Sequence, residues 1–214
     1  MEFEAYREFK HILAAIFVLT VVIGFSFALE GNWIFLAQAL LFSAIIIAVS
    51  VFSKKIAAHL LDADVEHEIW NFSRYGFRPH QYFKNTLPFG VILPLFFTLF
   101  TLGKLKVMTF LTYETRALKI RAAKRFGFYS YAEMTDWHNG LIGSAGIISL
   151  ILLSVVSYFS GFEYLARISA FYAFFNLIPL GKLDGSQIFF GSKILWTTLA
   201  AIATILATYA LLLV

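Results

Sequence analysis

The sequence predicts an all-α polytopic membrane protein. Hydrophobic residues make up 60% of the 214 residues and charged residues only 14%, whereas soluble domains contain about 45–50% apolar residues. The few charges avoid several apolar runs of about 18 residues or more, and each such run is long enough to cross a hydrocarbon core of about 30 Å. Together these observations exclude the class of soluble globular enzymes.

The remaining composition excludes further classes of site. The chain contains no cysteine, which excludes disulfides, thiolate catalysis and cysteine-based zinc or iron-sulfur sites. Its net charge is +4, but the basic residues flank apolar segments. Positive charge in such positions is typical of membrane surfaces, so we expect the lipid bilayer and no nucleic acid as a partner.

Five apolar runs are expected to form transmembrane helices. The first covers residues 12–29 and lacks a small-x-small cleavage motif before Glu30, which predicts a retained span and not a signal peptide. The second covers residues 33–52, begins at Trp33 and is followed by two lysines, as is typical of the ends of a span. The other expected spans cover residues 140–158, 168–181 and 195–214.

A shorter apolar block, residues 87–102, contains Pro88, Gly90 and Pro94 and is expected to be re-entrant. If it enters and leaves on one face, 16 of the 17 Lys and Arg residues lie on the cytoplasmic side and only Arg167 lies outside. If the block crosses, the split becomes 8 against 9. We therefore predict a plasma-membrane protein with a cytoplasmic N-terminus and an external C-terminus. Irregular backbone at membrane depth is tolerated where protein buries it.

Two alternatives remain for the basic segment 104–122. The alternation of apolar residues with threonine and aromatic residues over 107–113 favours a short membrane-associated β-hairpin. The basic residues of 116–125 would equally suit an amphipathic helix lying on anionic lipid. No internal repeat is evident, so the whole chain, 1–214, is expected to form one domain.

Asp184 is an ionisable residue in an apolar segment, and such residues are functional candidates by default. Pro179 and Gly181 are expected to break the helix just before it. A broken helix offers free backbone groups beside a carboxylate, which suits a metal ion, another cation or an extended peptide. The alternative is that Asp184 and Gly185 form only a turn at the cytoplasmic surface.

The same segment, FNLIPLGKLDG at residues 175–185, carries a recognisable spacing. Asn-x-x-Pro followed by Asp-Gly resembles the second signature of the site-2 proteases, the intramembrane zinc metalloproteases, and is similar to their archaeal members. The resemblance implies that Asp184 is a zinc ligand and that Asn176, Pro179 and Gly185 bind unwound substrate. The order of spans and the membrane-dipping insert extend the resemblance over nearly the whole chain.

The other signature of that family, HExxH on the second span, is absent. Two histidines four residues apart and a glutamate base are what such a zinc site requires. Aligning the residues downstream places Ser50 and Lys54 at the two histidine positions and Val51 at the glutamate. This alignment rests on residues that resemble the family's alanine, glycine and valine positions: Ala58, Asp62 and Val65. A GPxxN element of the family also looks degraded here, as residues 146–150.

Because catalytic zinc normally needs three protein ligands and a water, Asp184 alone is insufficient. The resemblance therefore implies a catalytically degenerate homologue that needs no cofactor and binds a transmembrane segment or membrane partner beside residues 176–184. One alternative is an active zinc metalloprotease that combines Asp184 with non-standard histidine ligands. Another is a small ion transporter, which would need further charges within the membrane. The candidate histidines, each expected to be solvated or interfacial, are His59, His67, His80 and His138.

Lys54 leads to a sharper hypothesis. An ammonium group at a former ligand position would replace the metal beside Asp184, since a buried carboxylate without a cation is costly. The alternative is that Lys54 and Lys55 both extend to the cytoplasmic headgroups.

Overall fold

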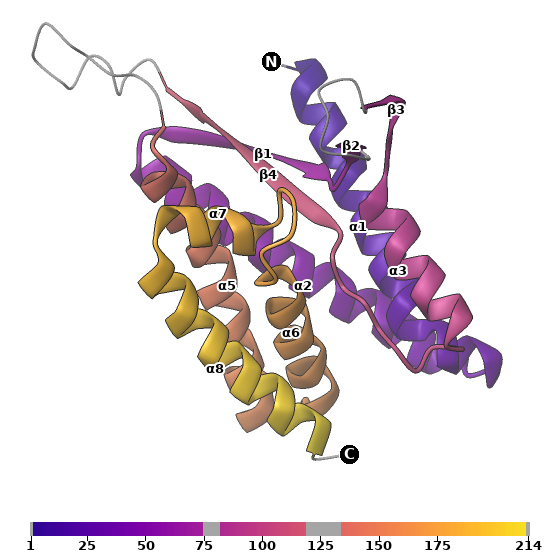
Figure 1. The fold of residues 1–214 in the computed structure, drawn as a ribbon. Helices are drawn as coiled ribbons and strands as arrows, with labels where there is room; N and C mark the ends of the chain where they lie inside the picture. The colour runs from indigo at the N-terminus through magenta and orange to yellow at the C-terminus, as the bar shows by residue number, and fades with distance from the viewer. Residues whose placement is uncertain (1, 75–81, 119–133, 213–214) are drawn as a thin grey trace, which may run out of the picture. The chain divides into compact units, whose positions relative to one another are not determined.

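The computed structural model describes residues 2–74, 82–118 and 134–212, and the chain is mostly helical (Figure 1). The helices are α1 (Glu2–Leu29), α2 (Trp33–Leu60), α3 (Phe89–Phe100), α5 (Asp136–Phe159), α6 (Glu163–Asn176), α7 (Asp184–Gly191) and α8 (Lys193–Leu212). The strands are β1 (Ala63–Ile69), β2 (Phe72–Arg74), β3 (Tyr82–Leu87) and β4 (Leu111–Ala117).

Four helices, α1, α2, α5 and α8, are long and apolar enough to cross a membrane. The structure is consistent with the expected helical membrane protein, although the strands among the described residues make it mostly helical and not all-α. Helix α6 has 14 residues, which cover about 21 Å, less than the hydrocarbon core of about 30 Å. It begins earlier than the expected span 168–181, with Glu163 in its first turn, where a carboxylate is favourable. A count of five spans stays a prediction.

Helix α2 continues eight residues past the expected end of the second span, so that Lys54 and Lys55 lie within it. Alanines at 57 and 58 favour continued helix. The helix ends at Leu60, and Asp62, with a φ of 53°, turns the chain into β1. After the expected end of the second span at residue 52, the chain thus continues as helix to Leu60 and then as strand β1.

The chain divides into two compact units, residues 1–44 with 68–112 and residues 45–67 with 113–214. Helix α2 and strands β1 and β4 contribute residues to both units. The expectation of a single domain stays a prediction.

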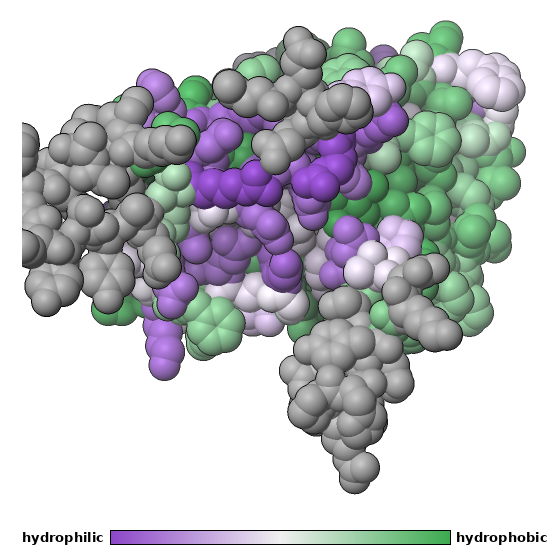
Figure 2. Space-filling view, turned by 90° about the horizontal axis from the view of Figure 1, so that it is seen from above, coloured by the Kyte–Doolittle hydropathy of each residue, from purple (hydrophilic) through white to green (hydrophobic). Residues whose placement is uncertain are grey.

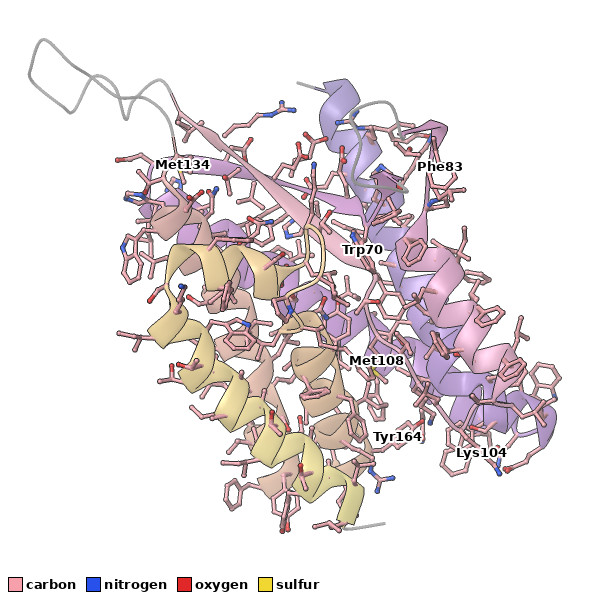
Figure 3. The ribbon with its side chains drawn as sticks, viewed as in Figure 1. Trp70, Phe83, Lys104, Met108, Met134 and Tyr164 are labelled. Atoms are coloured by element: carbon pink, nitrogen blue, oxygen red, sulfur yellow. The ribbon has the colours of Figure 1, made fainter. Side chains whose placement is uncertain are left out.

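In the first unit, the segment from 88 to 110 begins and ends beside the same residue, Trp70. The backbone N–H of Gly90 donates to the carbonyl of Trp70 at 2.8 Å, and the N–H of Trp70 donates to the carbonyl of Phe110, also at 2.8 Å. A Cβ atom at Gly90 would collide with the Phe110 carbonyl oxygen, so only glycine permits this approach. Both ends of the segment therefore meet at Trp70 (Figure 3).

Helix α3 carries this segment away from Trp70, and the chain reverses at Leu102 and Gly103, which have φ values of 52° and 79°. Gly103 packs beside Ser26, near the end of α1. Residues 104–110 then return without helix, with the side chains of 107–110 buried. Figure 3 shows Met108 on this return path, between Lys104 and Trp70.

This geometry supports a re-entrant segment but corrects its bounds. The expected range 87–102 covers only the outward half, which is helical despite Pro94, and the irregular backbone lies in the return, 104–110. Lys104 therefore lies at the tip of the excursion and not at its origin. Burial by surrounding protein is what permits irregular backbone at membrane depth.

Strand β4 does not form a hairpin within 104–122, so that expectation was wrong. It pairs with β1. The N–H of Leu118 donates to the Asp62 carbonyl at 3.1 Å at one end, and Trp70 bonds Phe110 at the other, which makes the pairing antiparallel. Strands β2 and β3 form a second antiparallel pair. The alternative helix over 116–125 falls mostly outside the described residues, and Arg116 and Ala117 are in β4.

In the second unit, α5 packs against α6, α7 and α8. Glycines make the contact between α5 and α7 close: a Cβ at Gly140 would lie 3.3 Å from the Cα of Gly191. A core cluster joins α5, α7 and α8: Ile147, Leu177, Ile188, Leu199 and Ala203.

Hydrophilic side chains gather on the face seen from above in Figure 2, whereas large exposed hydrophobic residues such as Phe17, Leu152 and Ile205 lie along the long helices.

Candidate functional site

Lys54 and Asp184 form a buried ion pair in the second unit. The Lys54 Nζ lies 2.5 Å from the Asp184 Oδ2, and the two side chains are 3% and 2% exposed. The hypothesis that an ammonium group stands beside this carboxylate is confirmed. Extension of Lys54 to the headgroups is contradicted, and Asp184 does more than form a surface turn.

The carboxylate is positioned by the break between α6 and α7. Helix α6 ends at Asn176, Gly181 adopts a φ of 57°, and Asp184 is the first residue of α7. The expected break at Pro179 and Gly181 is confirmed. A carboxylate in the first turn of a helix interacts favourably with the helix dipole and the free N–H groups there.

The ammonium group is positioned by the packing of α2 against α5 and β4. A Cβ at Gly146 would lie 2.5 Å from the Lys54 Cε, so the lysine stem passes directly over this glycine. The Nζ lies 4.9 Å from the centroid of the Tyr113 ring, within range of a cation–π interaction. The hydroxyl of Ser53 lies 2.8 Å from that of Ser149 and ties α2 to α5.

Tyr113 was not identified from the sequence as part of this site. Its hydroxyl donates to the carbonyl of Asn139 at 2.6 Å and lies so close to Gly143 that a Cβ there would be 2.5 Å away. Burial, and then the negative charge of Asp184, raise the pKa of Tyr113 well above its ordinary value of 10.0. The phenol therefore stays neutral and keeps its donated hydrogen bond.

One carboxylate oxygen remains without a hydrogen bond. The Asp184 Oδ1 is buried and accepts none from the described residues. The nearby Ser186 hydroxyl instead donates to the carbonyls of Gly181 and Leu183, at 2.7 and 2.8 Å. A buried polar atom without a hydrogen bond costs free energy. The stability of the buried Asp184 carboxylate therefore depends on its single ammonium partner, Lys54.

The donor set does not fit a catalytic zinc ion. The positions that the site-2-protease resemblance would align with a metal-binding motif hold Ser50, Val51 and Lys54, all buried, and the Lys54 ammonium group lies against Asp184. Zinc requires three nitrogen, sulfur or carboxylate ligands around one point. Within residues 2–74, 82–118 and 134–212, no three His, Asp or Glu side chains are grouped so as to hold a metal.

The three residues expected to bind substrate lie in different environments. Asn176 is buried, and its amide donates to the Tyr172 carbonyl of its own helix at 2.8 Å. Gly185 is also buried, and a Cβ there would collide with the Leu177 carbonyl. Pro179 is exposed. Only Pro179 is therefore open to a ligand in this conformation, and Gly185 serves close backbone packing.

The candidate histidines that the structure describes lie in or beside other helices and strands than Asp184. His59 is exposed at the end of α2, and the Nδ1 of His138 lies 2.5 Å from the Thr135 hydroxyl at the start of α5. His67 is fully buried in β1, so the expectation of a solvated residue was wrong, because a strand and not a loop follows α2. His80 lies outside the described residues.

A pocket of about 450 Å³ lies beside the ion pair. One wall is β4, from Tyr113 to Thr115, and the other comes from Gly181, Lys182 and α7. Lys182 and Glu114 bridge these walls with an exposed ion pair of 2.8 Å. The Gln187 amide donates to the Tyr113 carbonyl at 2.9 Å. The sequence indicated the second wall through its Pro-Gly break. The alternation over 107–113 indicated β structure near the first wall, but not the pairing of β4 with β1.

Comparison of the chain with protein-family models, with curated proteins and with solved structures gave no match. The functional assignment therefore depends on the residues described above.

Proposed function

We propose that this protein is a site-2-protease-like integral membrane protein that binds transmembrane segments without hydrolysing them. The observation that carries the proposal is the 2.5 Å contact between Lys54 and Asp184. A buried ion pair at this point preserves the fold and at the same time excludes a metal from the carboxylate.

The backbone after α2 supports the alignment on which this proposal depends. Asp62, aligned with a glycine of the family, has a φ of 53°, a conformation that glycine adopts without strain. Ala58 is buried in a cluster with Val65 and Tyr113, and Val65 lies in β1, in agreement with the aligned valine-containing strand.

The binding surface that we propose is the pocket between β4 and the broken segment 177–183. The β4 wall presents backbone groups of an extended strand, and the facing wall is not helical before Asp184. An unwound transmembrane segment could add to such a surface through main-chain hydrogen bonds. Helices that unwind easily would be preferred, because unwinding costs them less free energy.

The proposed topology has five spans, a cytoplasmic N-terminus and an external C-terminus in the plasma membrane. In it, α6 together with residues 177–183 forms the fourth span. The excursion that begins and ends at Trp70 leaves this topology unchanged, because a segment that returns to its starting face does not invert the later spans.

Metal analysis tests the absence of zinc chemistry. We expect far less than one zinc per chain in protein purified in detergent without chelator. The triple variant Ser50→His, Val51→Glu, Lys54→His should bind about one zinc, and adding Asp184→Ala should abolish that binding. One zinc in the wild-type chain, lost in Asp184→Ala, would instead support an active protease with non-standard ligands.

Peptide binding tests the proposed activity. Two synthetic transmembrane peptides, one with a central Asn-Pro and one with Leu-Ala, are titrated against the protein in nanodiscs and followed by fluorescence energy transfer. We expect tighter binding of the Asn-Pro peptide by about tenfold, a difference of about 1.4 kcal/mol. Thr115→Trp in the pocket should abolish the preference, whereas Ile34→Trp on the exposed face of α2 should not. Equal binding of both peptides would contradict the proposal.

A further inference from the structure

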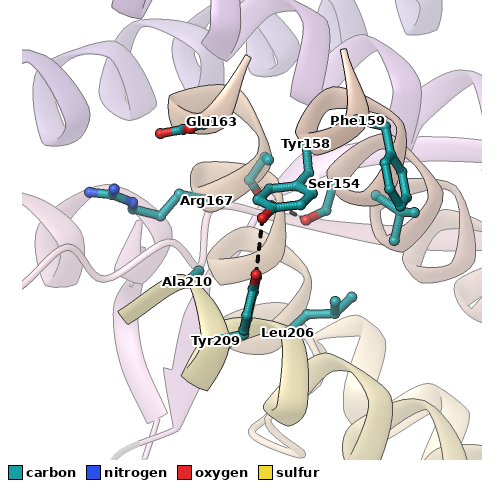
Figure 4. A pocket seen from close by; sticks show the side chains of 10 residues that line it. Ser154, Tyr158, Phe159, Glu163, Arg167, Leu206, Tyr209 and Ala210 are labelled. Carbon is teal, nitrogen blue, oxygen red and sulfur yellow. Dashed lines mark hydrogen bonds between the residues drawn. The ribbon is translucent and has the colours of Figure 1, made fainter. Parts of the chain in front are cut away.

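A second cavity, of about 370 Å³, lies between α5, α6 and α8 at the end where α6 begins (Figure 4). Part of its wall is apolar and comes from Val155, Leu206 and Ala210. Residues 163–176 separate it from the Lys54–Asp184 site by the length of α6, about 20 Å. The cavity is thus distinct from the surface to which we assign peptide binding.

Two tyrosines mark the membrane depth of this cavity. The hydroxyls of Tyr158 and Tyr209 lie 3.0 Å apart and join α5 to α8, with their ring centroids 5.8 Å apart. Figure 4 shows this bond across the cavity. Tyrosines at the ends of apolar helices are typical of the boundary between hydrocarbon and headgroups. The cavity therefore lies where a lipid headgroup meets its acyl chains.

Two opposite charges line the same cavity one helical turn apart. Glu163 and Arg167 both belong to α6 and both contribute to the wall. Within the described part of the chain, neither forms an ion pair with the other or with a third residue. The cavity thus presents a separated carboxylate and guanidinium group beside an apolar wall.

We propose that this cavity binds a phospholipid whose headgroup carries both a phosphate and an ammonium group. The phosphate accepts hydrogen bonds from Arg167, whose planar guanidinium group suits phosphate oxygens. The ammonium group lies at Glu163, and the acyl chain follows the apolar wall at Val155 and Leu206. Glu163 favours this headgroup over one that is only anionic, because the carboxylate attracts the ammonium group that the anionic headgroup lacks.

Native mass spectrometry of the delipidated full chain in detergent tests this assignment. The protein is titrated with dioleoyl phosphatidylethanolamine and, separately, with dioleoyl phosphatidylglycerol. We expect phosphatidylethanolamine to bind about tenfold more tightly. Arg167→Gln should weaken its binding about tenfold or more, since a charged hydrogen bond is lost. Glu163→Gln should bring phosphatidylglycerol binding close to that of phosphatidylethanolamine.

Variants that fill the cavity distinguish a lipid bound inside it from lipid or detergent that only surrounds the helices. Leu206→Trp or, independently, Val155→Phe should fill the cavity and remove the tight adduct, while circular dichroism shows unchanged helix content. Lys193→Gln, at the opposite end of α8, should leave both affinities unchanged. Binding that survives both Arg167→Gln and the filling variants would overturn the proposal, as would equal wild-type affinity for the two lipids.

Discussion

Lys54 and Asp184 determine each other's environment. Both are nearly inaccessible, and the Asp184 Oδ1 has no other donor among the described residues. The protein packed around the two side chains, and not solvent, therefore keeps them in contact. Removing one partner leaves an uncompensated buried charge, whereas removing both leaves a neutral site.

We expect Lys54→Met and Asp184→Asn each to lower the free energy of unfolding by about 3–5 kcal/mol. The double variant should recover most of that loss, because no charge remains buried. The exposed pair Lys182–Glu114 serves as control, and Lys182→Met should cost only about 0–1 kcal/mol. Titration with SDS in mixed micelles measures the free energy of unfolding of all four variants. Additive losses in the double variant would show that the two charges are independent.

Tyr113 gives the site a dependence on alkaline pH. Because burial and the charge of Asp184 raise its pKa in the folded state above the unfolded value of about 10, the protonated phenol stabilises the fold. This contribution is complete below about pH 9, one unit below the unfolded-state pKa, and is lost as the pH rises toward the higher folded-state pKa. The stability advantage of wild type over Tyr113→Phe should therefore decrease between about pH 9 and pH 11. An advantage that is constant over this interval would contradict the assignment.

At the scale of elements, glycines decide how closely the helices approach. Gly146 on α5 leaves room for the flexible stem of Lys54, whereas Gly185 on α7 packs against the rigid backbone of Leu177. These two contacts predict different responses to the same added methyl group. A side chain can be removed by a second substitution, but a backbone carbonyl cannot.

We expect Gly146→Ala to cost about 1–3 kcal/mol in the wild type, as overpacking does. In a Lys54→Ala, Asp184→Asn background the cost should fall below about 1 kcal/mol, because alanine is otherwise favourable in a helix. Gly185→Ala should cost the same in both backgrounds. Unfolding midpoints give the double-mutant cycle, and an unchanged cost for Gly146→Ala would refute the proposed contact.

At the level of the whole molecule, the proposed topology depends on whether the excursion from Trp70 returns to its starting face. Because the chain contains no cysteine, single introduced cysteines report their side of the membrane directly. We expect Thr86→Cys and Arg116→Cys to react with an impermeant maleimide from the cytoplasmic side. Ser160→Cys should react from the outside. Labelling of residues 86 and 116 from opposite sides would show that the segment crosses only once.

Several features of this fold are predictable from local sequence. The apolar runs determine where the long helices lie, because hydrocarbon thickness sets their length. The break before Asp184 follows from Pro179 and Gly181, whose backbone preferences are intrinsic. The absence of an HExxH motif is likewise visible without reference to any structure.

Other features depend on residues far apart in the chain. A lysine near the end of an apolar run can extend to headgroups or turn inward, and the inward direction of Lys54 depends on Gly146, Tyr113 and Asp184 together. The local sequence pattern also does not predict the pairing of β4 with β1 or the burial of His67 that accompanies it. Hydropathy and backbone preference act within one segment, so the helices and the break follow from the local sequence. Which side chains meet depends on tertiary packing, because each contact requires the surfaces of segments that are distant in the chain.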